Sequence, residues 1–112
     1  MGIQQWSEDI IMVDLANAEP ELSEELRAVC DQLEAGADCH VVINMGDTSY
    51  INSSNIAQLL MIREGVGKAN RELRLTGLNV GILDVMATTG LEKVFEIVDD
   101  LPMAIASLQL GE

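Results

Sequence analysis

The sequence predicts an α/β fold, in one domain over residues 1–112. We expect a small mixed β-sheet, mostly parallel with an antiparallel start, and about four helices. Short apolar runs typical of strands alternate with longer segments whose apolar residues recur at helical spacing. This alternation indicates parallel strands joined by right-handed helical crossovers. The length of 112 residues suits a single core, and an apolar content of 48% is ordinary for a globular protein.

The first third of the chain predicts a strand pair followed by a helix. Apolar bursts near Trp6 and over residues 10–13 flank a polar turn, which is typical of antiparallel strands. Pro20 and the acidic residues after it suit the positively polarised start of a helix, which should end before Gly36. Its apolar face comprises Leu22, Leu26, Val29 and Leu33.

The central segment predicts a buried strand, a polar loop and a second helix. Residues 40–45 have the length and β-branching of a buried strand. The helix should begin among residues 52–55 and run to Ala69 or Asn70, because serine and asparagine favour helix starts. That end of a helix also favours negative charge, including a phosphate. The apolar face of this helix comprises Ile56, Leu59, Ile62, Val66 and Ala69.

The last third predicts two more strand–helix units. Residues 72–76 alternate as a strand with one more exposed face, and residues 94–98 form a further short strand. The third helix should start after Leu78 and Asn79, pass through Val80, Leu83 and Met86, and close near residues 88–90. Asp99 and Asp100 should cap a last helix, which presents one apolar face of Leu101, Ile105 and Leu108.

The charge and composition exclude several classes of function. A net charge of −13 and a pI of about 4.1 argue against binding to nucleic acid or an anionic membrane, and are compatible with a basic protein partner. No apolar run has the length of a membrane span and the start lacks a secretory pattern, so we expect a cytoplasmic protein. Cys30 and Cys39 have neither metal nor redox spacing and are expected to be reduced, small core residues.

No catalytic constellation is present in the sequence. His40, the one histidine, opens a strand that looks buried, so we expect a structural or surface role for it. Residues 65–68 look like the end of a phosphate-binding loop, but they fall inside the predicted second helix. We therefore expect a protein that is not an enzyme and has no catalytic residue, metal site or cofactor.

Two neighbouring hydroxyls remain, those of Ser53 and Ser54. One reading is that they only cap the second helix. The other is that they belong to a docking surface, since the outward side of that helix carries Ala57, Leu60 and Met61 beside Glu64 and Lys68. A small apolar patch with flanking charges suits transient binding of a protein partner.

At these residues the sequence resembles the STAS-domain family, specifically the bacterial anti-sigma factor antagonists. The resemblance rests on four segments in family order: 41–45, 50–56, 73–78 and 89–95. They correspond to a hydrophobic strand, the helix-opening serine motif, a strand with its turn, and a Thr-Gly-Leu before a short strand with phenylalanine. The resemblance implies a single STAS-like domain with a small mixed sheet, helices on one side of it, and a role in regulating transcription.

The resemblance also implies a phosphorylation switch. In such antagonists the first serine of the motif is phosphorylated by an anti-sigma factor, which is a serine kinase of the histidine-kinase-like ATPase type. The unphosphorylated form binds this partner and releases a sigma factor. The acceptor here would be Ser53, with Ser54 less favoured. Together with the outward side of the second helix, the motif gives the residues that we expect to bind the partner: Asn52, Ser53, Ser54, Asn55, Ala57, Leu60 and Met61.

Two residues depart from the family motif. The family aspartate is Asn52 here, which removes a charge beside the acceptor hydroxyl. The family glycine is Asn55, which we expect to add a side chain where a partner approaches.

Two other functions remain open from the sequence. One is a STAS adaptor without phosphorylation in a larger signalling or transport complex, which the two asparagines support. The other is a small-molecule or nucleotide-binding domain that uses the helix start as its anion site, although a glycine-rich loop is lacking. The sequence identifies neither the sigma factor nor the oligomeric state.

Overall fold

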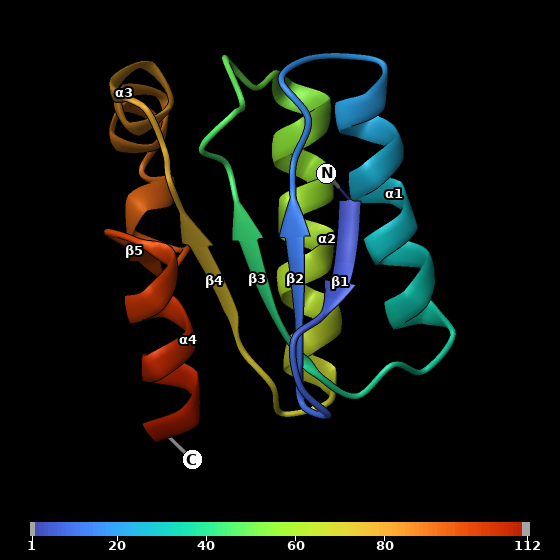
Figure 1. Cartoon of the computed structure of the whole chain (residues 1–112). Coiled ribbons are helices and arrows are strands. Elements are labelled where there is room, and N and C mark those ends of the chain that lie inside the picture. The colour runs from blue at the N-terminus through green and yellow to red at the C-terminus, as the bar shows by residue number, and fades with distance from the viewer. Residues whose placement is uncertain (1, 111–112) are drawn as a thin grey trace.

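The computed structural model describes residues 2–110 and confirms the predicted α/β class (Figure 1). The sheet has five strands in the order β1-β2-β3-β4-β5, with β1 antiparallel to β2 and all other neighbours parallel. The strands are β1 (Gly2–Gln5), β2 (Ile10–Asp14), β3 (His40–Asn44), β4 (Leu73–Thr76) and β5 (Ile97–Val98). The helices are α1 (Glu21–Glu34), α2 (Ser53–Lys68), α3 (Val80–Thr89) and α4 (Leu101–Leu110), with a 3₁₀ turn η1 (Leu91–Lys93) after α3.

Helices cover both faces of the sheet, whereas the resemblance implied helices on one side. Val41 and Ile43 of β3 point into the main core, to which α1 and α2 contribute. Val42, between them, packs in a second cluster with Ala104 and Ile105 of α4. Since successive strand residues face opposite sides, α4 lies on the face opposite α1 and α2, as Figure 1 shows. This double cover explains why β3 is buried along almost its whole length.

The N-terminal half follows the sequence prediction closely. The predicted antiparallel pair is present, closed by a hydrogen bond of 2.9 Å from the Trp6 amide to the Ile10 carbonyl. Residues 65–68 lie inside α2, as expected. A Cβ atom added at Gly65 would lie 3.1 Å from Cδ1 of Leu33, so this glycine lets α1 and α2 approach closely.

The C-terminal half differs from the prediction in which side chains are buried. The limits and the Asn79 cap of α3 are as predicted, but Ile82 and Met86 form its buried side, while Val80 and Leu83 are exposed. All four side chains are apolar, so their spacing alone does not select the packed face. The predicted strand over 94–98 is reduced to β5, whose two residues pair with the end of β4.

The histidine and the two cysteines lie in or beside the core, where packing and hydrogen bonds account for them. His40 is buried, and its Nδ1 accepts a hydrogen bond of 3.0 Å from the Glu72 amide, which matches a structural role. Cys39 is buried and Cys30 half-buried, both are free thiols, and burial raises the pKa of each. A low thiol reactivity follows, because the thiolate is the reactive form.

Residues 2–110 contain neither a membrane-spanning helix nor a clustered set of metal-binding side chains. None of the helices there is both long and apolar enough to cross a bilayer. No group of three or more histidine, cysteine or acidic side chains within that range is arranged to hold a metal ion.

Candidate protein-docking site

The predicted serines lie at the carboxyl end of the parallel strands, where the loops after β2, β3 and β4 meet (Figure 1). We call residues 46–55 the serine loop; they connect β3 to the first turn of α2. On one side, the Thr48 hydroxyl donates to the Ala16 carbonyl at 3.0 Å. On the other, the Asn79 amide donates to the carbonyls of Ser49 at 2.9 Å and Thr48 at 3.2 Å. Neighbouring loops therefore hold the serine loop from both sides.

Gly77 allows the start of the serine loop to lie against the end of β4. Its φ of +79° is in the left-handed region, and an added Cβ would lie 2.7 Å from the backbone nitrogen of Gly46. The Asn44 side-chain oxygen, which accepts from that nitrogen at 3.0 Å, would be only 2.8 Å from the same Cβ. The close approach of Gly46 and the left-handed φ thus explain why glycine follows β4 in the family-like segment 73–78.

Asparagines, and not serines, cap α2. The Asn52 side chain accepts a hydrogen bond of 2.9 Å from the Asn55 amide, and the Asn55 side chain accepts one of 3.0 Å from the Asn52 amide. This reciprocal arrangement is a capping box. Ser53 and Ser54 are the first two helical residues, both exposed, and neither hydroxyl is hydrogen-bonded to another described residue. The reading in which the serines only cap the helix is therefore wrong.

The Asn55 side chain is buried, whereas the sequence led us to expect it at the surface that a partner approaches. Its side chain is 0% exposed, and its amide nitrogen donates to Oε2 of Glu19 at 3.2 Å and to the Ser23 hydroxyl at 3.2 Å. It also lies 3.4 Å from the Gln58 side-chain oxygen. Where the family has glycine, this chain therefore has a buried side chain whose hydrogen bonds connect α2 to the start of α1.

Glu19 is the shared acceptor of these hydrogen bonds. Its carboxylate accepts hydrogen bonds from the hydroxyl of Ser23, from the Ser23 amide at 2.7 Å, and from the side chains of Asn55 and Asn52. The pKa of Glu19 is lowered, first by the Ser23 hydroxyl and then by the Ser23 amide, with smaller contributions from the two asparagines. An ionised carboxylate is therefore favoured beside the serine loop.

The outward side of α2 forms the mixed surface that its spacing predicted. Ala57, Leu60 and Met61 are exposed, Met61 at 53%, and Glu64 and Lys68 are exposed near them along the helix. Of the seven residues expected to bind a partner, all except Asn55 are thus accessible on the surface.

Two apolar residues near the serine loop are exposed although the sequence did not predict it. Tyr50 is 58% exposed and Val80 is 74% exposed. Each follows directly one member of the hydrogen-bonded pair Ser49 and Asn79, so the two residues flank one junction between loops. Their position after polar loop residues was the only available sign, because each also fits a core pattern. The accessible apolar surface around the serine loop therefore includes the start of α3.

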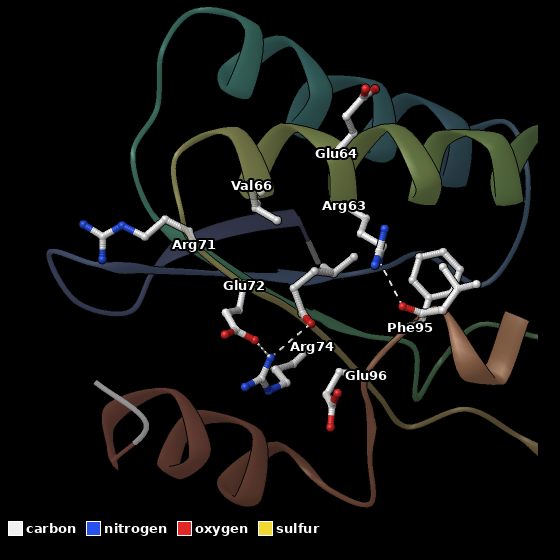
Figure 2. Close-up of a pocket in the computed structure, with 11 residues that line it drawn as sticks. Arg63, Glu64, Val66, Arg71, Glu72, Arg74, Phe95 and Glu96 are labelled. Carbon is white, nitrogen blue, oxygen red and sulfur yellow. Dashed lines mark hydrogen bonds and ion pairs between the residues drawn. The ribbon is translucent and has the colours of Figure 1, made fainter.

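A cleft lies on the opposite side of α2 from α1, and three of the six lysine and arginine residues of the chain line it (Figure 2). This arginine cleft, about 320 Å³ in volume, is lined by residues that include Arg63, Arg71 and Arg74. Arg74 pairs with Glu72 at 2.7 Å, Arg71 pairs with Asp38 at 2.7 Å, and Arg63 donates to the Val94 carbonyl at 3.0 Å. Glu64 and Glu96 also line the cleft.

The model of the STAS domain matches residues 13–104, and the chain belongs to the STAS domain family. No curated protein matches the sequence significantly.

Solved structures share the whole fold at low identity. An anti-sigma-factor antagonist (STAS) domain protein from Planctomyces limnophilus is 12% identical with a TM-score of 0.81, covering 97% of this chain and 99% of that one. TM1081 from Thermotoga maritima is 16% identical with a TM-score of 0.80, covering 96% and 92%. The unphosphorylated form of the anti-sigma factor antagonist SpoIIAA is 12% identical with a TM-score of 0.73, covering 98% and 97%, and its phosphorylated form, from Bacillus, is similar as well.

Proposed function

We propose that this protein is a non-enzymatic regulator in the bacterial cytoplasm that acts by binding a protein partner through the serine loop and the outward side of α2. The observation that carries the proposal is the pair of exposed, unbonded serine hydroxyls at the start of α2. They adjoin an accessible patch of Ala57, Leu60 and Met61. Similarity to structures of anti-sigma factor antagonists supports an anti-sigma factor as the partner.

Phosphorylation of Ser53 by that anti-sigma factor, a serine kinase of the histidine-kinase-like ATPase type, is the proposed control. Ser53 is the first residue of α2, where unpaired backbone amides favour an anion. A phosphate would add about −1.5 to −2 charges there. Burying that charge against a partner would cost desolvation, so the phosphorylated form should bind poorly and the sigma factor should stay sequestered.

Two measurements test this function. After incubation with the anti-sigma kinase and ATP, intact mass should rise by one phosphate for the native chain and for Ser54→Ala, but not for Ser53→Ala. By calorimetry with the same partner, Ser53→Asp should bind about tenfold or more weakly than Ser53→Ala, because an interface disfavours an unpaired charge. Equal affinities of the two variants would contradict the proposal.

A constitutive STAS adaptor is the second candidate, and Asn52 is the observation in its favour. Asn52 caps α2 through its side chain but brings no charge next to Ser53, whereas the family motif has an aspartate there. An adaptor would bind its partner with equal affinity whether residue 53 is serine, alanine or aspartate, and its mass would not change with kinase and ATP.

A further inference from the structure

Glu19 lies on a different loop from the serines, yet it contacts the residues on both sides of them. Its Oε2 accepts from the Asn55 side chain at 3.2 Å and from the Asn52 side chain at 3.5 Å. These residues are 36 and 33 positions away along the chain, and they are the two members of the capping box. One carboxylate therefore contacts both ends of the segment that contains Ser53 and Ser54.

The carboxylate is itself fixed in position by the start of α1. It accepts a hydrogen bond of 2.7 Å from the backbone amide of Ser23 and another from the hydroxyl of the same residue. The Ser23 hydroxyl also accepts a hydrogen bond of 3.2 Å from the Asn55 side chain. The Ser23 carbonyl accepts one of 3.1 Å from the Gln58 side chain. The first turns of α1 and α2 thus share one polar network, in which Glu19 is the only group that carries a charge.

This network brings a carboxylate to the residue where the family motif has one. Asn52 is neutral, but its side-chain nitrogen donates to the Glu19 carboxylate. The pKa of Glu19 is lowered, chiefly by the Ser23 hydroxyl, so its ionised form is favoured. Ser53 follows Asn52 directly. A phosphate or an aspartate at position 53 would be attracted by the helix start and repelled by the Glu19 carboxylate, which contacts the preceding residue. Because Glu19 is exposed, water and salt weaken this repulsion, so a modest effect is expected.

We infer that Glu19 is a positioning residue for the switch: it holds Asn52 and Asn55 so that Ser53 and Ser54 stay accessible, and a negative charge placed on Ser53 loosens this hold by repulsion. The inference rests on the proposed function. It goes further by naming the group within the chain that senses the modification. The loosened segment is the serine loop, the same segment that would meet the partner.

A double-mutant cycle tests the inference with the protein alone. Ser53→Asp is introduced into the native chain, into Glu19→Gln and, as a matched control, into Glu21→Gln, which removes an exposed acidic group from the first turn of α1 without touching the network. Amide hydrogen exchange of residues 52–56 is the readout. Ser53→Asp should speed this exchange about threefold or more in the native and Glu21→Gln backgrounds, and leave it unchanged or slower in Glu19→Gln, where the attraction of the helix start acts alone.

A second measurement needs no substitution at Glu19. Carboxyl resonances followed by NMR should show a higher pKa for Glu19 in Ser53→Asp than in Ser53→Asn, because a like charge nearby disfavours ionisation. The same change in exchange in the native and Glu19→Gln backgrounds, or an unchanged Glu19 pKa, would overturn the inference. Its failure is separable from failure of the proposed function, which is decided by whether Ser53→Asp and Ser53→Ala differ in affinity for the partner.

Discussion

The serine loop and the arginine cleft lie on different sides of α2 and use polar groups in opposite ways. In the arginine cleft the guanidinium groups are engaged by carboxylates or by a backbone carbonyl, as Figure 2 shows for Arg74 and Glu72. In the serine loop, the side chains of Asn52 and Asn55 bond each other's backbone amides, and Ser53 and Ser54 stay exposed. The polar groups of the cleft are therefore paired within the fold, whereas the serine loop leaves two hydroxyls exposed, as the proposed docking role requires.

The largest expected effect concerns the steric support of the serine loop. Gly77→Ala should lower the free energy of unfolding by about 3 kcal/mol, because the left-handed φ and the approach to the Gly46 backbone each cost energy. Gly90→Ala is the matched control: its φ of +78° is similar, but nothing lies within 4 Å of the added Cβ, so about 1 kcal/mol is expected. Equal losses in urea unfolding would show that the contact with Gly46 carries no weight.

The next effect separates the buried asparagine from the exposed serines. Asn55→Ala should cost about 2–3 kcal/mol, because it removes half of the capping box and leaves the Asn52 amide without its acceptor. Ser54→Ala, one residue earlier and exposed, should change stability by less than about 0.5 kcal/mol. Thermal unfolding of both variants checks the difference, and a costly Ser54→Ala would contradict the view that the serine hydroxyls are free.

The same contrast explains what sequence reasoning reached. Strands, helices and the asparagine caps follow from local periodicity and from the hydrogen bonds that short polar side chains make to nearby backbone. The accessible serines and the outward side of α2 followed from the same spacing. The role of Asn55 did not, because its partner Glu19 is 36 residues away and only the folded chain brings them together. The exposed face of α3 was missed because apolar residues occupy both of its sides.

A smaller effect is expected in the arginine cleft. Arg74 has 13% of its side chain exposed and Glu72 has 60%, so their pair is partly screened by solvent. Arg74→Ala should cost about 1 kcal/mol, part of it from lost packing of the aliphatic stem, and the coupling to Glu72→Ala should be below about 1 kcal/mol. A double-mutant cycle at low and high salt measures this coupling. A much larger value would mean that the cleft is more than a partly exposed ion pair.

Glu19 should also contribute to the dependence of stability on pH. Its pKa in the folded state lies below its ordinary value of 4.5, chiefly because the Ser23 hydroxyl donates to it. Its stabilising contribution is therefore fully present above pH 4.5 and is lost as the pH falls through the lowered folded-state value. Glu19→Gln should flatten unfolding free energy against pH only in this acidic range, with Glu21→Gln as the control. A difference between Glu19→Gln and the native chain that is constant from pH 7 to pH 3 would contradict this assignment.

The smallest expected effect is a null result that bears on the nucleotide-binding alternative. The lining of the cleft includes three carboxylates beside its three arginines, and Glu19 places a negative charge beside the start of α2. The helix start favours a phosphate held covalently on Ser53, but with carboxylates close to both places we expect only weak binding of free anions, so ATP, GTP and inorganic phosphate should leave the melting temperature within about 1 °C of the free protein. A clear rise that Arg63→Ala abolishes would assign an anion site to the cleft. A rise abolished by Ser53→Asp would assign it to the helix start, and either result would end the division of roles between the two regions.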